Sequence, residues 1–294
     1  MMMMRWFSRP ILGLTILGIV LPPAAQAEEP YRLTQKDAAL LLGGAAALGV
    51  GAFLLNSRTQ DVPAVGLDRN EINLKWDRDA LAIPNPSALG SSDACLVLSG
   101  ISPTAMFAVT GGDGRTWSAA GRLWTVQAEA SLVAAGASFL IKRAASRPRP
   151  YTYLPEADRP SGAEYDVTQE RAFESFPSNH ATVAWAGGIA GASYLAFSRP
   201  DFSGSVHFLS GALVGGFATA TGVLRIESGQ HFPTDVVAGS LLGAVTGVGI
   251  AYLSRGSAPE EGSRGDALRN CLLGAAAGTV IALLVTPPAS PWVH

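Results

Sequence analysis

The chain alternates between long uncharged stretches and short polar segments. A membrane-spanning helix needs about 20 apolar residues, and seven stretches reach or approach that length. They run over Ala38–Leu55, Ala94–Thr110, Leu123–Ile141, Ala181–Phe197, Val206–Leu224, Val236–Leu253 and Leu268–Val285. This pattern predicts an all-α protein, a polytopic bundle of membrane helices, with some of the shorter stretches packed inside the bundle.

Glycine is frequent in these stretches, and it recurs there at a spacing of four residues. The chain contains 33 glycines, and a spacing of four places two small residues on one helix face, where another helix can approach closely. The spacing therefore predicts close helix packing at three pairs, which are Gly187 and Gly191, Gly211 and Gly215, and Gly239 and Gly243.

Composition excludes several classes of protein. Hydrophobic residues make up 48% of the chain and charged residues 15%, and the formal charge is −2. There is no basic stripe with interleaved aromatic residues, so we expect no nucleic-acid partner. Cys95 and Cys271 lie in or beside apolar stretches, which predicts small buried side chains rather than a disulfide framework. No Cys/His spacing typical of zinc occurs, and we expect no metal.

The first 27 residues have the pattern of an export signal. Arg5 and Arg9 precede an apolar core over Ile11–Leu21, and Ala25-Gln26-Ala27 is a small-x-small cleavage site. We therefore expect a signal peptide over 1–27 and a mature chain that begins near Glu28. An uncleaved anchor is the alternative interpretation.

The polar segments divide the remaining chain. Residues 28–93 combine the first apolar stretch with an amphipathic surface segment, which includes a helix-like piece around Glu71–Leu81. Residues 94–254 form the predicted catalytic core, with 38–55 as its first helix, and 255–294 add an apolar helix and a tail. Tyr151–Phe176 is a Pro- and acid-rich loop that we interpret as a lid or substrate-selecting segment. The charged connector Arg255–Asp266 is predicted to be a solvated loop, and Glu129, inside an apolar stretch, to face the bundle interior.

Three polar clusters interrupt the apolar sequence, each at the end of a stretch. They are Lys142-x6-Arg149-Pro150, Pro177-Ser178-Asn179-His180 and Arg225-x5-His231-x3-Asp235. Phosphoryl transfer requires fixed donors around the phosphate oxygens, and arginine can bind two of them at once. Taken alone, Lys142, Arg143, Arg147 and Arg149 resemble an ordinary basic patch beside a membrane. The other two clusters favour an anion site.

Local helix signals place the histidines of these clusters. Ser178 suits the N-cap of the helix that follows, so its first N–H groups and the positive end of its dipole favour an anion beside His180. Pro233 suits the first turn of the next helix. His231 then lies just before that helix and Asp235 one turn inside it, where the carboxylate can reach one imidazole nitrogen and leave the other free to attack.

These clusters resemble the signature of the type 2 phosphatidic acid phosphatase (PAP2) and vanadium haloperoxidase superfamily, which is Lys-x6-Arg-Pro, Pro-Ser-Gly-His and Ser-Arg-x5-His-x3-Asp. The resemblance covers roughly residues 38–254 and implies a six-helix core. Two positions depart from the signature. Asn179 stands where glycine is usual but keeps a backbone N–H for an anion, and Leu224 replaces a serine and removes a possible hydroxyl contact.

The resemblance also implies a role for each residue. His231 is the nucleophile that forms a phosphohistidine, Asp235 orients it, and His180 acts first as general acid and then as general base. The phosphate oxygens are held by Lys142, Arg149, Arg225, Ser178 and Asn179. Neither a metal nor a cofactor is required.

We therefore expect a metal-independent phosphatase that acts on a lipid phosphate or diphosphate, with bilayer lipids as its surroundings and no obligate protein partner. The resemblance suggests phosphatidic acid, phosphatidylglycerophosphate, undecaprenyl diphosphate or lipid A as substrate. Alternatives are a vanadate-dependent haloperoxidase, a non-specific acid phosphatase with the same anion site, and an inactive membrane scaffold. We expect a bacterial-type inner membrane location and, by resemblance alone, a periplasmic site, although counting spans from an exported Glu28 places the clusters in the cytoplasm.

Overall fold

A computed structural model describes residues 33–54, 58–110, 117–256 and 261–286. These residues form eight α-helices joined by loops and short 3-10 turns, with no β-strand among them, which confirms the all-α prediction. The helices are α2 (Gln35–Leu54), α3 (Lys75–Asp79), α4 (Ser87–Thr110), α5 (Trp117–Ala145), α6 (Asn179–Ser198), α7 (Gly204–Glu227), α8 (Pro233–Ser254) and α9 (Glu261–Val285). The predicted signal peptide over 1–27 lies outside the described residues.

Five of the described segments are long and apolar enough to cross a membrane. They are Ser87–Thr110, Ser118–Tyr153, Gly204–Glu227, Pro233–Ser254 and Ser263–Val285. The helix α6 is not among them, since Gly, Ala and Ser make up much of its sequence. Most of its residues are buried inside the protein. This agrees with the expectation that some shorter stretches pack within the bundle, and the five spans are compatible with a multi-pass membrane protein.

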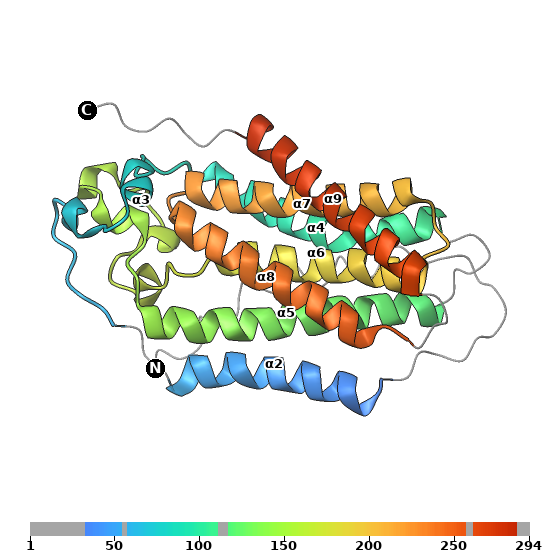
Figure 1. Ribbon diagram of the computed structural model, residues 1–294. Helices are drawn as coiled ribbons and strands as arrows, with labels where there is room; N and C mark the ends of the chain where they lie inside the picture. The colour runs from blue at the N-terminus through green and yellow to red at the C-terminus, as the bar shows by residue number, and fades with distance from the viewer. Residues whose placement is uncertain (1–32, 55–57, 111–116, 257–260, 287–294) are drawn as a thin grey trace.

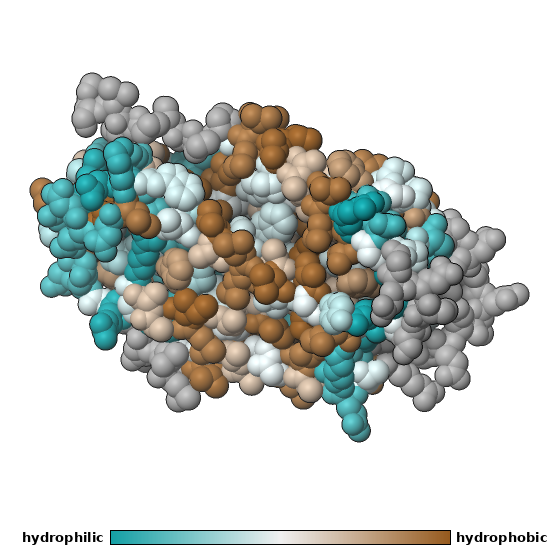
Figure 2. Space-filling view, viewed as in Figure 1, coloured by the Kyte–Doolittle hydropathy of each residue, from teal (hydrophilic) through white to brown (hydrophobic). Residues whose placement is uncertain are grey.

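The helices are arranged around α6. It contacts α4, α5, α7 and α8, while α2 packs on α5 and α9 packs on α7 (Figure 1). The segment with α3 lies at the left end of the bundle in Figure 1, together with the loop between α5 and α6. Apolar residues cover the middle of the visible surface and hydrophilic residues gather towards its ends (Figure 2). This distribution matches a bundle whose sides face lipid.

Several helix boundaries differ from the predicted ones. The helix α4 begins at Ser87, seven residues before the predicted stretch, and α9 begins at Glu261, inside the connector predicted as a solvated loop. Hydropathy marks only the apolar part of a helix, so polar turns that continue it are missed. The helix-like piece around 71–81 is shorter than predicted, consisting of a 3-10 turn over Arg69–Glu71 and α3.

The three glycine pairs lie where neighbouring helices meet closely, which confirms the prediction of close packing. A methyl group on Gly211 would overlap the carbonyl oxygen of Cys271 in α9. On Gly239 it would lie 2.5 Å from the carbonyl oxygen of Ser178, where α8 meets α6. On Gly187 it would lie 2.6 Å from the hydroxyl oxygen of Ser131 in α5. The other members of the pairs are equally close to a neighbouring helix and are Gly191, Gly215 and Gly243.

Polar side chains inside the bundle also connect the helices. The Gln127 amide in α5 donates to the carbonyl oxygen of Gly100 in α4 at 2.6 Å and to that of Gly187 in α6 at 3.3 Å. Glu129 is fully buried and faces the interior, as predicted. The Gln127 bonds fix the rotation of α5, whose last turn carries Lys142.

We expect Gly211→Ala to destabilise the protein because the added methyl group forces α7 and α9 apart. Overpacking of this kind costs about 1–3 kcal/mol, which thermal unfolding of the purified protein in detergent would measure. Gly249→Ala in α8 is the matched control, since nothing lies within 4 Å of the added methyl group. Equal melting temperatures for the two variants would contradict the close contact.

Candidate active site

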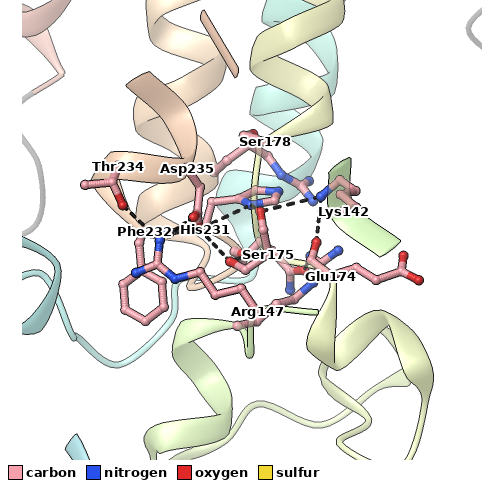
Figure 3. A network of polar contacts seen from close by, with 12 residues as sticks. Lys142, Arg147, Glu174, Ser175, Ser178, His231, Phe232, Thr234 and Asp235 are labelled. Carbon is pink, nitrogen blue, oxygen red and sulfur yellow. Dashed lines mark hydrogen bonds and ion pairs between the residues drawn. The ribbon is translucent and has the colours of Figure 1, made fainter. Parts of the chain in front are cut away.

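The three polar clusters meet at one end of the bundle. They come from the last turn of α5 and the loop after it, the first turn of α6, the last turn of α7 and the first turn of α8. Figure 3 shows Lys142, Ser178, His231 and Asp235 gathered there around Ser175. The structure thus brings together every predicted site residue, namely Lys142, Arg149, Ser178, Asn179, His180, Arg225, His231 and Asp235.

His231 is held as a neutral imidazole with one nitrogen free. Its side chain is 2% exposed, and its Nδ1 lies 2.7 Å from the carbonyl oxygen of Ser175. A carbonyl oxygen only accepts, so Nδ1 carries the hydrogen and Nε2 keeps its lone pair. Burial lowers the pKa of His231 well below its ordinary value, and the charges of Lys142 and Arg149 lower it further. A neutral imidazole with a free Nε2 is the form that can attack phosphorus.

Asp235 does not make the direct hydrogen bond to His231 that its spacing predicts. Its carboxylate lies 3.8 Å from Nδ1 of His231, and three other donors occupy it. These are the Ser175 hydroxyl at 2.5 Å, the Phe232 backbone N–H at 2.8 Å and the Arg147 guanidinium at 2.6 Å. The effect on His231 therefore passes through Ser175, whose hydroxyl donates to Asp235 and whose carbonyl oxygen accepts from the imidazole.

Arg147 connects this site to the surface segment, and sequence reasoning missed its importance. One guanidinium nitrogen binds Asp235, and the other binds Asp77 of α3 at 2.7 Å. Asp77 is fully buried and also accepts from the Thr234 hydroxyl at 2.6 Å, and the Arg147 guanidinium stacks 4.3 Å from the ring of Phe232. In the sequence, Arg147 belongs to a basic patch and Asp77 to a charged surface piece, so no local signal pairs them.

Two of the predicted phosphate-binding cations already donate to loop carbonyls. Lys142 is 4% exposed, and its ammonium donates to the carbonyl oxygen of Glu174 at 2.6 Å. The Nε of Arg149 donates to the carbonyl oxygen of Arg171 at 2.7 Å, and its Nη1 donates to the side-chain oxygen of Gln230. These bonds fix both cations beside His231 and leave further N–H donors on each for a ligand.

Other polar atoms at the site are buried without a hydrogen-bond partner. Ser178 occupies the N-cap position of α6, as predicted, but its hydroxyl makes no capping bond. That hydroxyl, the Nε of Arg225 and the side-chain oxygen of Asn179 are all buried and unsatisfied. Leaving a buried donor unpaired costs about 1–3 kcal/mol. An anion with several acceptor oxygens, such as phosphate, fits the two donors.

His180 lies in the first turn of α6 and is the most accessible of the candidate catalytic groups. Its side chain is 33% exposed, and its Nε2 is 3.2 Å from the carboxylate of Asp93 in α4. Burial and the charge of Arg225 lower the pKa of His180 to about 4, while Asp93 acts in the opposite direction. Asp93 was not predicted, because it directly precedes an apolar stretch and belongs to none of the three clusters.

The loop between α5 and α6 covers the site with a series of 3-10 turns. They span Pro150–Tyr153, Glu156–Asp158, Ala163–Tyr165 and Glu170–Phe173. The Tyr165 hydroxyl donates to the carbonyl oxygen of Ser228 at 3.0 Å. Hollows of about 1130 and 690 Å³ lie against residues 60–81, and neither is lined by His180 or His231. His231 is 2% exposed at this site, whereas His180 is 33% exposed.

The PAP2 superfamily family model matches residues 124–258, which contain all three clusters. The match covers just under half of the chain and supports membership of the PAP2 superfamily. This membership implies phosphatase or haloperoxidase-type chemistry. No curated protein sequence matches the chain. The matched segment covers most of α5 and all of α6, α7 and α8, so Asp77 and Asp93 lie outside it.

We expect Arg147→Ala to destabilise the protein by about 3–5 kcal/mol, because it leaves the buried carboxylates of Asp77 and Asp235 without their cation. Chemical unfolding followed by tryptophan fluorescence would measure the loss. Lys75→Ala is the control, since its pair with Asp79 is exposed at the surface and exposed pairs contribute less than about 1 kcal/mol. A similar unfolding midpoint for both variants would show that Arg147 does not hold this end together.

Proposed function

We propose that the chain is a metal-independent phosphatase that hydrolyses a lipid phosphate or diphosphate through a phosphohistidine on His231. One observation carries the proposal. A neutral buried imidazole with a free Nε2 lies among three cations, beside the unpaired donors of Ser178 and Arg225. This arrangement supports binding of a phosphate group and in-line attack on it by a nitrogen nucleophile.

The first step transfers the phosphoryl group to the enzyme. The Nε2 lone pair of His231 forms a bond to phosphorus while the bond from phosphorus to the leaving oxygen breaks. His180, protonated, gives its proton to that oxygen. Lys142, Arg149 and Arg225 stabilise the negative charge that spreads over the equatorial oxygens. The bound phosphate brings the negative charge that favours the imidazolium form of His180, which is disfavoured in the empty site.

The second step releases phosphate and restores the enzyme. His180, now neutral, accepts a proton from water as the water oxygen attacks phosphorus and the bond to Nε2 breaks. Inorganic phosphate leaves, His231 returns to its neutral form, and His180 is protonated again. The carbonyl oxygen of Ser175 holds Nδ1–H throughout, and the Asp235 carboxylate at 3.8 Å offsets the positive charge of the phosphorylated imidazole.

The position of the site supports a lipid as the substrate. The candidate residues sit at the ends of helices whose sides carry exposed apolar residues, such as Leu241 and Val245 of α8 and Leu272 and Leu273 of α9. A substrate anchored in the bilayer by an acyl or prenyl chain would therefore bring its phosphate to the depth of the cations. A water-soluble phosphate ester lacks that anchor, so a lipid phosphate is the substrate class that we favour.

We expect purified wild-type protein to release phosphate from a lipid phosphate in EDTA, with inhibition by vanadate, and His231→Ala to lose at least about 10³-fold in kcat because the nucleophile is absent. Labelling with ³²P should trap a phosphoenzyme in the wild type only. His207→Gln is the matched control, since His207 is a buried histidine in the first turn of α7, away from the three clusters. Wild-type turnover in His231→Ala would refute the mechanism.

We further propose that the site faces the periplasm, and accessibility labelling tests this. Ser161→Cys places a thiol in the loop over the site, where the residue is exposed, after Cys95 and Cys271 have been replaced by serine. We expect a membrane-impermeant maleimide to label this thiol in cells whose outer membrane alone is permeable. Labelling that requires a permeable inner membrane would place the site in the cytoplasm.

A further inference from the structure

One carboxylate at this site, that of Asp93, lies within hydrogen-bond distance of a histidine. It belongs to a helix outside the matched family segment. Asp93 of α4 places its carboxylate oxygen 3.2 Å from Nε2 of His180. The three clusters run from Lys142 to Asp235, so none of them includes Asp93. The contact joins the first turn of α6 to α4, a helix that the sequence predicts only as a membrane span.

The position of Asp93 is fixed by the packing of α4 on its neighbours. The Ser92 hydroxyl donates to the carbonyl oxygen of Thr221 in α7 at 3.1 Å, and the Ser99 hydroxyl donates to that of Ala184 in α6 at 2.8 Å. Gly188 lets the two helices approach, because a methyl group there would lie 2.5 Å from the Ser99 hydroxyl oxygen. One of these bonds comes from the residue next to Asp93, and the other reaches the carbonyl one turn after His180. Together they fix the position of Asp93 relative to His180.

The charges around His180 explain why a carboxylate beside it is useful for catalysis. Burial is the main factor that opposes a positive imidazole at this position, and Arg225 and Lys142 oppose it further, so the pKa of His180 is about 4. A general acid must nevertheless carry a proton when the leaving oxygen departs. Among the groups that face His180 in the described residues, Asp93 is the carboxylate that favours the protonated form.

We propose that Asp93 is a positioning residue for the general acid and base His180, an inference that rests on the proposed phosphatase function. Its carboxylate accepts Nε2–H, which turns Nδ1 towards the substrate and offsets the positive charge of the imidazolium. In the first step the Nδ1 proton passes to the leaving oxygen as its bond to phosphorus breaks. In the second step Nδ1 accepts a proton from the attacking water, while Asp93 keeps its hydrogen bond and stays ionised.

The two histidines thus have partners suited to different tasks. His231 must be neutral to attack, and its Nδ1–H is held by an uncharged carbonyl oxygen. His180 must alternate between charged and neutral forms, and its Nε2 faces a carboxylate. A carboxylate hydrogen-bonded directly to the nucleophile would favour the protonated, unreactive imidazole in the empty site, and Asp235 stays 3.8 Å from His231. Hydrogen-bonded to the acid, a carboxylate favours the form that donates.

Asp93→Asn tests the proposal with two substrates that differ in their need for an acid. Dodecyl phosphate leaves as a strongly basic alkoxide and requires protonation, whereas p-nitrophenyl phosphate leaves as a weakly basic phenolate. We expect kcat/KM, which reports only the step in which the leaving group departs, to fall about 10–100-fold in Asp93→Asn on dodecyl phosphate and less than about 5-fold on p-nitrophenyl phosphate. Asp93→Glu should recover most of the activity, and Asp93→Asn should add little to the loss already caused by His180→Ala.

Asp79→Asn is the matched control, since Asp79 is a half-exposed carboxylate at the same end of the bundle, where it pairs with Lys75. It should retain wild-type rates on both substrates. Equal rate losses on the two substrates in Asp93→Asn, or no loss on either, would overturn the role of Asp93 while wild-type turnover and its dependence on His231 persist. Absence of wild-type turnover, or its persistence in His231→Ala, would instead overturn the proposed function and this inference with it.

Discussion

The buried carboxylate of Asp235 is the interaction on which the geometry of this site depends. It accepts from the first turn of its own helix, from the loop hydroxyl of Ser175 and from Arg147. Arg147 carries the connection onward to Asp77, so helix α8, the loop between α5 and α6 and the surface segment share one network. A buried charge is tolerated only when it is fully paired, and that requirement fixes the parts relative to one another. The orientation of the His231 imidazole is fixed because the Ser175 carbonyl, which accepts its Nδ1–H, belongs to a residue held by the same network.

Close helix contact provides the second constraint. The site residues stand on the ends of four helices, so their separations are set by how near the helix axes come. Glycine at the contacts allows backbones to touch, as at Gly239 against the carbonyl oxygen of Ser178. Inside the bundle, the Gln127 amide bonds to carbonyls of α4 and α6. These contacts involve backbone and short side chains with little rotational freedom, which suits a site where small displacements of a cation weaken phosphate binding.

The sequence predicted which stretches form helices and which clusters lie together better than it predicted the pairs that individual side chains form. Apolar length identified the bundle, and helix signals at Ser178 and Pro233 correctly placed residues around the starts of α6 and α8. It could not predict that Asp235 pairs with Arg147 or that His180 meets Asp93, because those partners are far apart along the chain and meet only through packing. Hydropathy also missed the polar first turns of α4 and α9, because it identifies only the apolar part of a helix.

The glycines between α7 and α9 have a consequence for how relatives of this chain can differ. Gly211 and Gly215 press against the backbone of α9, and Gly274 and Gly278 press against the backbone of α7. Neither helix can gain a side chain at this seam unless the other retreats, so the two must change together over evolutionary time. The matched family segment contains α7 but ends before α9. A relative that lacks α9 is freed from this restriction and can carry larger residues on α7. The side chains at positions 211 and 215 would therefore show whether a helix equivalent to α9 packs there.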